Sequence, residues 1–318
     1  MKILVCMKND QDYIAKCYEA FKQGMKNTLG ATLYGQGYDG FDDNARTYRD
    51  IFDVVGFSPD VLFVRYDQNR PNRCIELHRK MGLAEVDCLK VMWIGDWWTL
   101  PDKEFRFWAK ENGIGLIASF FPQGAQAYSD LCRTACLPPC FDSRIFRDWK
   151  LPKEWDVGFL GAGVDSPSAH YPDRAKMHKK LLYSGLKYFW RPHPGWGNPK
   201  GHPLVGENFS KAINRCRLFV NACGVTKHAN SKYIEIPASG SVMLANRPVG
   251  IKRLHLENGV NFVEVSADSL IERAKRMLDD QDAMDRVRDR AVEDSLKHHT
   301  GDVRAAELRD IIRDMGIS

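Results

Sequence analysis

The stretch "CLPPCFDSRIFRDWKLPKEW", residues 136–155, separates two halves of the chain that follow the same pattern. It is rich in proline and has no helical or strand period, which is typical of a linker. Before it, five short runs rich in β-branched and aromatic residues alternate with helical patterns, and after it the alternation restarts. We expect strands at 2–7, 31–37, 60–66, 89–98 and 114–121, and again at 156–163, 187–192, 217–223, 241–247 and 260–265.

Helical segments separate these runs, and a chain of 318 residues exceeds most single cores. Strands that alternate with helices form βαβ units and therefore parallel sheets. The last 50 residues carry apolar residues at helical spacing, for example Leu270 and Ala274. The sequence therefore predicts an α/β protein of two Rossmann-like domains with a helical tail.

The composition is that of a globular protein, with 44% hydrophobic and 27% charged residues and a mean hydropathy of −0.41. No apolar run approaches the roughly 20 residues that span a membrane. The start "MKILVCMKND" resembles a first strand more than a signal peptide, so we expect a cytoplasmic location. The nine cysteines are then reduced thiols, because no disulfide pattern is evident.

The net charge of +5 is too small for a dedicated nucleic-acid binder. One segment, residues 65–80, is locally basic, with five Lys or Arg side chains. It is either a solvated surface or the landing place of an anionic acceptor such as DNA.

Two local motifs suggest chemistry that their surroundings do not favour. The stretch "GQGYDG", residues 35–40, matches a dinucleotide fingerprint, but it follows the second predicted strand and carries acidic Asp39. We interpret it as a tight turn. Cys132, Cys136 and Cys140 lack a fourth ligand for zinc, so we expect buried free thiols and no metal site.

Two strand ends of the second half are candidate ligand sites, because open α/β sheets bind ligands at the carboxyl ends of their strands. "FLGAG" ends in Gly161, Ala162 and Gly163, whose backbone N–H groups suit a phosphate. "FWRPHP" carries Arg191 and His193, the latter fixed between two prolines.

The stretch "SKYIEIPASG", residues 231–240, places one carboxylate in a run of apolar and small residues. If a helix starts here, its amino end and Lys232 suit a diphosphate. Glu235, one turn later, can accept two hydrogen bonds from a ribose diol. Ser239 and Gly240 are small enough for a close approach to the ligand. The alternative, an exposed glutamate on an amphipathic helix, would require polar neighbours, which are few.

In their order along the chain, these stretches resemble the glycosyltransferases of GT-B architecture, most closely the CgeB-like, family 1 group. The resemblance is carried by "YGQGYDG", "LPPCFDSRIFRDW", "WDVGFLGAG", "SKAINRCRLFVNAC", "SKYIEIPASGSVMLANR" and a closing His299-Thr300 with Arg304. It implies two Rossmann-like domains that face each other across a cleft. Residues 1–145 would bind the acceptor and 146–300 the nucleotide-sugar donor, with a final helix over 301–318 that packs back on the first domain.

The resemblance also implies roles for single residues. Glu235 would bind the donor ribose and Lys232 its diphosphate, while Gly161 to Gly163, Ser239 and Gly240 would supply backbone contacts. The donor would be a UDP- or GDP-sugar, and neither a metal nor another cofactor would be required. Many relatives carry a glutamate eight residues before the ribose-binding one, where this chain has Lys227. We expect Lys227 or His228 to neutralise the diphosphate instead, and retention or inversion stays open.

An inverting transfer needs a base near the acceptor hydroxyl. Asp96 in "WIGDWW" is the first candidate, with Trp97 and Trp98 able to stack on a sugar or a base, although Asp96 also suits a helix N-cap. Asp10 and His193 are further catalytic candidates. Two other functions stay open: an NAD(P)-dependent oxidoreductase that uses "GQGYDG", and a nucleotide-sugar-binding module without catalysis. The acceptor is DNA, a glycan, a protein or a small molecule.

Overall fold

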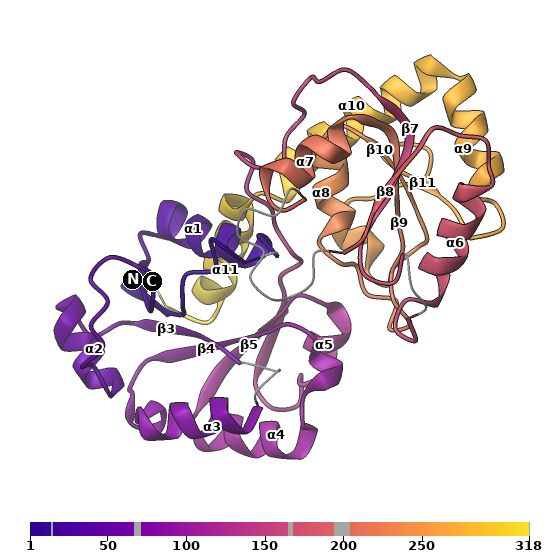
Figure 1. Cartoon of the computed structure of the whole chain (residues 1–318). Coiled ribbons are helices and arrows are strands. Elements are labelled where there is room, and N and C mark those ends of the chain that lie inside the picture. Colours follow the sequence, from indigo (N-terminus) through magenta and orange to yellow (C-terminus); the bar gives the residue numbers. More distant parts are fainter. Residues whose placement is uncertain (14, 67–70, 165–167, 194–203, 318) are drawn as a thin grey trace. The chain divides into compact units, whose positions relative to one another are not determined.

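The computed structural model describes residues 1–13, 15–66, 71–164, 168–193 and 204–317 of the chain (Figure 1). The chain forms two compact units. The first comprises Met1–Asp10, Phe21–Pro138 and Gly301–Ser318, and the second comprises Gln11–Ala20 and Pro139–Thr300. Within the described ranges no helix has both the length and the apolar character that a bilayer crossing requires.

The first unit is built on a six-stranded parallel sheet of order β2-β1-β3-β4-β5-β6. The strands are β1 (Ile3–Cys6), β2 (Thr32–Tyr34), β3 (Val61–Arg65), β4 (Leu89–Ile94), β5 (Ile114–Ser119) and β6 (Arg133–Cys136). The first five confirm the predicted strands. The sequence did not predict β6, a four-residue edge strand without an apolar run, whose partner is β5.

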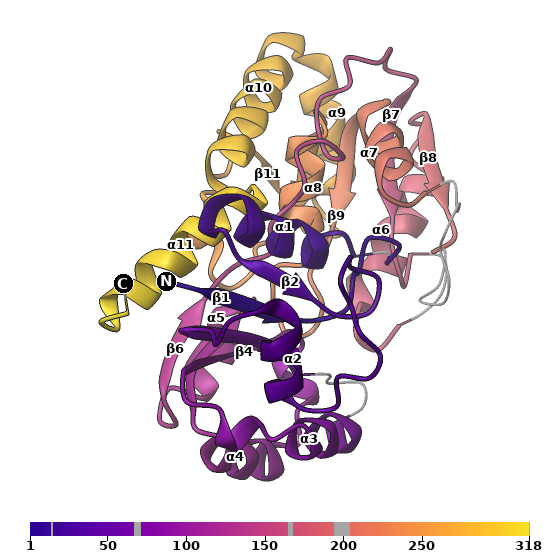
Figure 2. The same cartoon turned by 90° about the vertical axis from the view of Figure 1, so that its left-hand side faces the viewer.

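Helices cover both faces of this sheet, as the two views show (Figures 1 and 2). Phe21 of α1 packs edge-on against Phe63 and Trp93 on one face, while Tyr48, Phe105 and other apolar residues of the opposite helices fill the other. The helices are α1 (Cys17–Leu29), α2 (Tyr48–Val55), α3 (Pro71–Lys80), α4 (Asp102–Glu111), α5 (Pro122–Ala127) and α11 (Gly301–Asp314), with 3-10 turns at Leu83–Glu85 and Trp97–Thr99.

The second unit holds a five-stranded parallel sheet of order β11-β10-β9-β7-β8. Its strands are β7 (Trp155–Leu160), β8 (Tyr188–Arg191), β9 (Cys216–Asn221), β10 (Val242–Ala245) and β11 (Val263–Glu264). Each overlaps a predicted run, and β7 and β9 begin one residue before theirs. Its helices are α6 (Pro172–Leu182), α7 (Glu207–Asn214), α8 (Lys232–Ala238), α9 (Leu270–Asp279) and α10 (Gln281–His298), with a 3-10 turn at Ile251–Leu254. The predicted α/β class with two parallel sheets is therefore confirmed.

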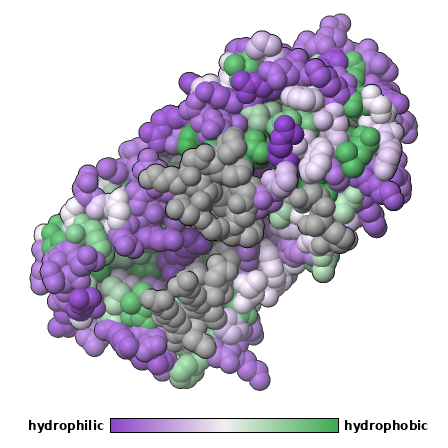
Figure 3. Space-filling view, viewed as in Figure 1, coloured by the Kyte–Doolittle hydropathy of each residue, from purple (hydrophilic) through white to green (hydrophobic). Residues whose placement is uncertain are grey.

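Two apolar clusters form the core of the second unit, one on each face of its sheet. One includes Ile213 of α7 and Tyr233 of α8, and the other includes Met177 of α6 and Leu270 of α9. On the face drawn in Figure 3, hydrophilic side chains predominate over the described surface of each unit. The apolar residues are thus used mainly in the cores.

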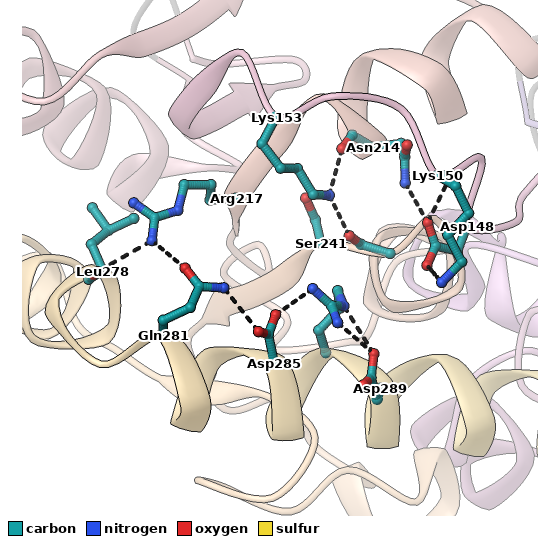
Figure 4. Close-up of polar contacts among 12 residues, drawn as sticks. Asp148, Lys150, Lys153, Asn214, Arg217, Ser241, Leu278, Gln281, Asp285 and Asp289 are labelled. Atoms are coloured by element: carbon teal, nitrogen blue, oxygen red, sulfur yellow. Dashed lines mark hydrogen bonds and ion pairs between the residues drawn. The ribbon is translucent and has the colours of Figure 1, made fainter.

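Asn214, at the end of α7, binds the linker to the second unit (Figure 4). Its amide nitrogen donates to the carbonyl of Ser239, at 2.7 Å, and to Oδ1 of Asp148, at 2.9 Å. Its amide oxygen accepts from the backbone N–H of Leu151, at 3.0 Å. Because the Asn214 side chain is fully buried, water cannot take its place as the hydrogen-bond partner of these groups.

Lys153 makes a second attachment of the linker in the same region (Figure 4). Its ammonium group donates to the carbonyls of Asn214, at 2.5 Å, and of Gly240, at 2.7 Å. Gly240 has φ 74°, and a Cβ there would lie 2.7 Å from Cγ of Asp148. Only glycine therefore allows the linker to pass this turn.

We predict that Asn214→Ala lowers the free energy of unfolding by about 3 kcal/mol, since one donor, the N–H of Leu151, and two acceptors, on Ser239 and Asp148, lose their partner. Urea denaturation followed by circular dichroism measures this change. Asn44→Ala is the matched control, because the Asn44 side chain is exposed and, among the described residues, bonds only its neighbour Asp42. Equal destabilisation by both variants would contradict the assignment.

Candidate functional site

A pocket of the second unit lies at the carboxyl ends of β7 and β8, beside the first turn of α8. The strand order places the topological switch point of this sheet between β7 and β9, and ligands of open parallel sheets bind there. The lining residues include the apolar Phe146, Leu160, Pro192, Leu204 and Phe209 and the polar His193, Ser231, Lys232 and Glu235. The pocket thus combines an apolar wall with a few convergent polar groups, as small-molecule sites do.

Gly161 follows β7 and forms part of the pocket lining. Its φ is 148°, and a Cβ there would lie 3.3 Å from Nη1 of Arg174 and 3.6 Å from Nζ of Lys232. The glycine therefore brings the main chain close to two cations. Ala162 and Gly163 continue the turn, and Gly163 has φ 75°. The structure thus brings predicted Gly161 and Lys232 together.

Arg174, from the first turn of α6, fixes this turn from behind. Its Nη1 donates to the carbonyl of Ala162, at 2.8 Å, and its Nε and Nη2 donate to the carbonyl of Ala222, at 3.1 and 2.8 Å. The side chain is 3% exposed and lies over the ring of Tyr171. Arg174 was not predicted as a site residue, although it follows the motif "FLGAG" at the start of the next helix.

Lys232 and Glu235 project from α8 into the pocket. Burial and the nearby Arg174 together lower the pKa of Lys232 to about 8, although Glu235 acts in the opposite direction. Burial raises the pKa of Glu235 above its usual range, against the opposing effects of Lys232 and Ser231. Glu235 is 4% exposed, so the exposed amphipathic-helix interpretation is wrong. Since α8 has only seven residues, these side chains carry more of the electrostatics than its dipole does.

The structure does not place Ser239, Gly240, Lys227 or Arg191 among the described residues that line this pocket. Ser239 is fully buried, and its hydroxyl bonds Ser210 and the carbonyl of Glu235. Lys227 lines a different pocket of the same unit. Arg191 is exposed and donates to the adjacent carbonyl of Trp190.

Two histidines lie near the strand ends of this unit. His193 lines the pocket, as predicted for a site residue after β8. His228 is buried next to His170, and burial together with His170 lowers its pKa to about 4. It bonds the hydroxyl of Thr226. A neutral His228 therefore stabilises the loop and supplies no positive charge at neutral pH.

Asp10 and Asp96 belong to the first unit. Asp10 is buried, with its Oδ2 2.9 Å from Nζ of the fully buried Lys22 and 3.8 Å from Nη1 of Arg65. A carboxylate in such an ion pair is poorly suited to accept a proton from an acceptor hydroxyl.

Asp96 stands at the carboxyl end of β4 and precedes the turn Trp97–Thr99. Its side chain makes no capping hydrogen bond, so the N-cap alternative is wrong for the side chain. Trp98 contacts the ring of Phe121, and Trp97 packs against the core. Asp96 is half-buried and remains the better catalytic candidate of this unit.

The turn at residues 35–40 follows β2 and packs on the segment after β1. A Cβ at Gly35 would lie 2.3 Å from the carbonyl oxygen of Met7, and the Asn9 side chain donates to the carbonyl of Gly37. The next helix, α2, begins only at Tyr48 behind its own capping box. A dinucleotide fingerprint requires a helix directly after its glycines, so the turn does not have that geometry.

Residues 67–70 of the basic segment 65–80 lie outside the described part of the chain. Arg65 ends β3, whereas Arg79 and Lys80 lie at the end of α3. Arg79 and Lys80 also pair with Glu111 and Glu76. Nucleic-acid contact through this segment stays a prediction.

All nine cysteines lie within the described residues and are free. In the described ranges, no three His, Cys, Asp or Glu side chains form a cluster that could hold a metal ion.

Residues 168–310 match the family described as glycosyl transferase-like. No curated protein matches the chain by sequence.

Solved structures resemble the chain over its whole length. HepE of Anabaena in complex with UDP gives a TM-score of 0.64 at 11% identity, over 99% of this chain and 100% of that chain. HepE in complex with UDP-glucose gives 0.63 at 10% identity, with coverage of 99% and 100%. Sucrose-phosphate synthase of Thermosynechococcus elongatus gives 0.64 at 8% identity, with coverage of 99% of both chains.

At such identities the structural likeness establishes the fold, which is GT-B with two Rossmann-like units. The family match adds the enzyme class. The predicted resemblance to GT-B glycosyltransferases and the prediction of a glycosyltransferase are therefore confirmed.

Proposed function

We propose that the chain transfers a sugar from a UDP-sugar that binds in the pocket of Lys232 and Glu235. The observation that carries the proposal is the pairing of buried Glu235 with half-buried Lys232 beside Gly161, in a pocket with an apolar wall. The HepE structures in complex with UDP and with UDP-glucose support the choice of donor. The second unit then serves as the donor domain and the first as the acceptor domain.

Each polar group has a role in this proposal. Glu235 accepts hydrogen bonds from the ribose diol, and the Lys232 ammonium binds the diphosphate beside the open main chain at Gly161. Arg174 adds positive charge behind the turn. As the glycosidic bond breaks, negative charge builds on the diphosphate, and these fixed cations stabilise it without a metal ion. Asp96 takes the proton of the acceptor hydroxyl, and His193 contacts the donor.

We predict that Lys232→Met and Glu235→Gln each weaken UDP binding at least tenfold, or about 1.4 kcal/mol. Each variant removes one group that contacts UDP in the proposed complex. Isothermal titration calorimetry with UDP in EDTA measures the change and also tests metal independence. Lys211→Met and Glu207→Gln are matched controls, because these residues form an exposed pair on the neighbouring α7.

Unchanged UDP affinity in both pocket variants would contradict the assignment of the site. NADH binding by a protein that does not bind UDP would favour the oxidoreductase. Release of UDP from UDP-glucose distinguishes an enzyme from a module that only binds the donor.

We also predict that UDP affinity falls as the pH rises through about 8. Below this pH Lys232 is protonated and attracts the diphosphate, and above it the charge is lost. Titrations between pH 6.5 and 9.5 measure the profile. Lys232→Arg should flatten it, because arginine stays charged throughout this range. The same decline with pH in both proteins would show that another group titrates.

A further inference from the structure

The second unit contains another pocket, of about 630 Å³, at the carboxyl ends of β10 and β11. This volume lies in the range of small-molecule sites. The proposed donor pocket does not use it. Its lining residues come from α6, the loop before α8, the strand ends and the start of α9, and include Lys176, Lys227, Asn246, Arg247, Ser266 and Arg273.

The charges around this pocket do not balance. Arg247 pairs with Glu264 at 2.7 Å, and Asp268 pairs with Lys180 at 2.7 Å, so both of these lining acids are neutralised. The remaining charged lining groups are three cations and the single acid Asp173. They are Lys176, Lys227 and Arg273, and none of the three makes an ion pair with a residue that the structure describes.

Lys227 enters the pocket from a strained backbone position. Its φ is 54°, in the left-handed region, which costs a non-glycine residue about 1–2 kcal/mol. Two backbone bonds hold the turn: the N–H of Lys227 donates to Gly224, at 2.9 Å, and the carbonyl of Lys227 accepts from Val249, at 2.7 Å. Glycine would fit here without strain, so the lysine side chain has a reason to be present that the fold does not supply.

We propose that this pocket binds a small molecule that carries a phosphate group, held by Lys227, Arg273 and Lys176. These three cations line one cavity, and three positive charges match a dianion better than a single carboxylate. The carboxylate of Asp173 provides an acceptor for hydroxyl groups of the same molecule.

The position of the pocket relates this ligand to the reaction. Lys227 is four residues before Ser231 of the donor pocket, so their Cα atoms lie at most about 14 Å apart. A sugar phosphate spans much of this distance. Only this relation rests on the proposed donor site; phosphate binding itself does not depend on it.

The test uses the full chain and two probes, inorganic phosphate and glucose 6-phosphate. Titration followed by amide NMR should give saturable shifts at Lys227 and residues 266–269. Lys227→Gly and Arg273→Gln should each weaken binding at least tenfold, and the former should not lower the urea midpoint. The matched controls are Lys150→Gly, a second lysine with positive φ, and Arg276→Gln, an exposed arginine on α9 outside the pocket. Both controls should bind the two probes with affinities within twofold of those of the unchanged chain.

Shifts spread over surface cations, or equal losses in variants and controls, would overturn the proposal. Saturable binding of a DNA duplex without binding of glucose 6-phosphate would also overturn it. UDP titrations of the same variants separate this question from the proposed function, since Lys227→Gly should bind UDP as the unchanged chain does.

With UDP-glucose present, glucose 6-phosphate should change the rate of UDP release by the unchanged chain but not by Arg273→Gln. The same change in both proteins would show that glucose 6-phosphate acts at another site.

Discussion

The hydrogen bonds of Arg174 are the constraint on which the candidate site depends. One buried guanidinium donates to the carbonyls of Ala162 and Ala222, which follow the two strands at the switch point of the sheet. A buried charge is costly unless its donors are satisfied, so these bonds fix both loops in one position relative to each other. Gly161 then stays open beside Lys232 before any ligand arrives. Such preorganisation reduces the free energy that binding must spend on ordering the loops.

The same arrangement explains the shifted pKa values of Lys232 and Glu235 on α8. Burial lowers the pKa of Lys232, Arg174 acts in the same direction, and burial raises the pKa of Glu235. Each charged form is therefore disfavoured in the empty pocket. Because the pKa of Lys232 in the folded state is below 10.5, its deprotonation stabilises the fold as the pH rises from about 8 to 10.5. An anionic ligand with hydroxyl groups compensates both charges at once, which is the usual exchange of stability for function at a binding site.

The local patterns predicted most of the fold but only part of the site. Runs of β-branched and aromatic residues predicted ten of the strands. The strand β6 has no such run, and it forms because it pairs with the edge of β5. Gly161, Lys232, Glu235 and His193 could be placed because each follows or begins a predicted element. Ser239 could not, because its bond to Ser210 joins residues far apart in the sequence. The same holds for Asp10, whose carboxylate forms an ion pair with Lys22 on the next helix.

Lys227 shows that two residues close in sequence on this loop can line different pockets. It precedes Lys232 by only five residues, and both were expected at one diphosphate, yet they line two different pockets. The left-handed backbone at Lys227 and its bond to Val249 turn the chain between them. If both pockets are filled, the segment 227–232 contacts both ligands, and neither can reposition it without affecting the other. Linkage then requires that each ligand change the affinity of the other by the same factor, whichever of them binds first.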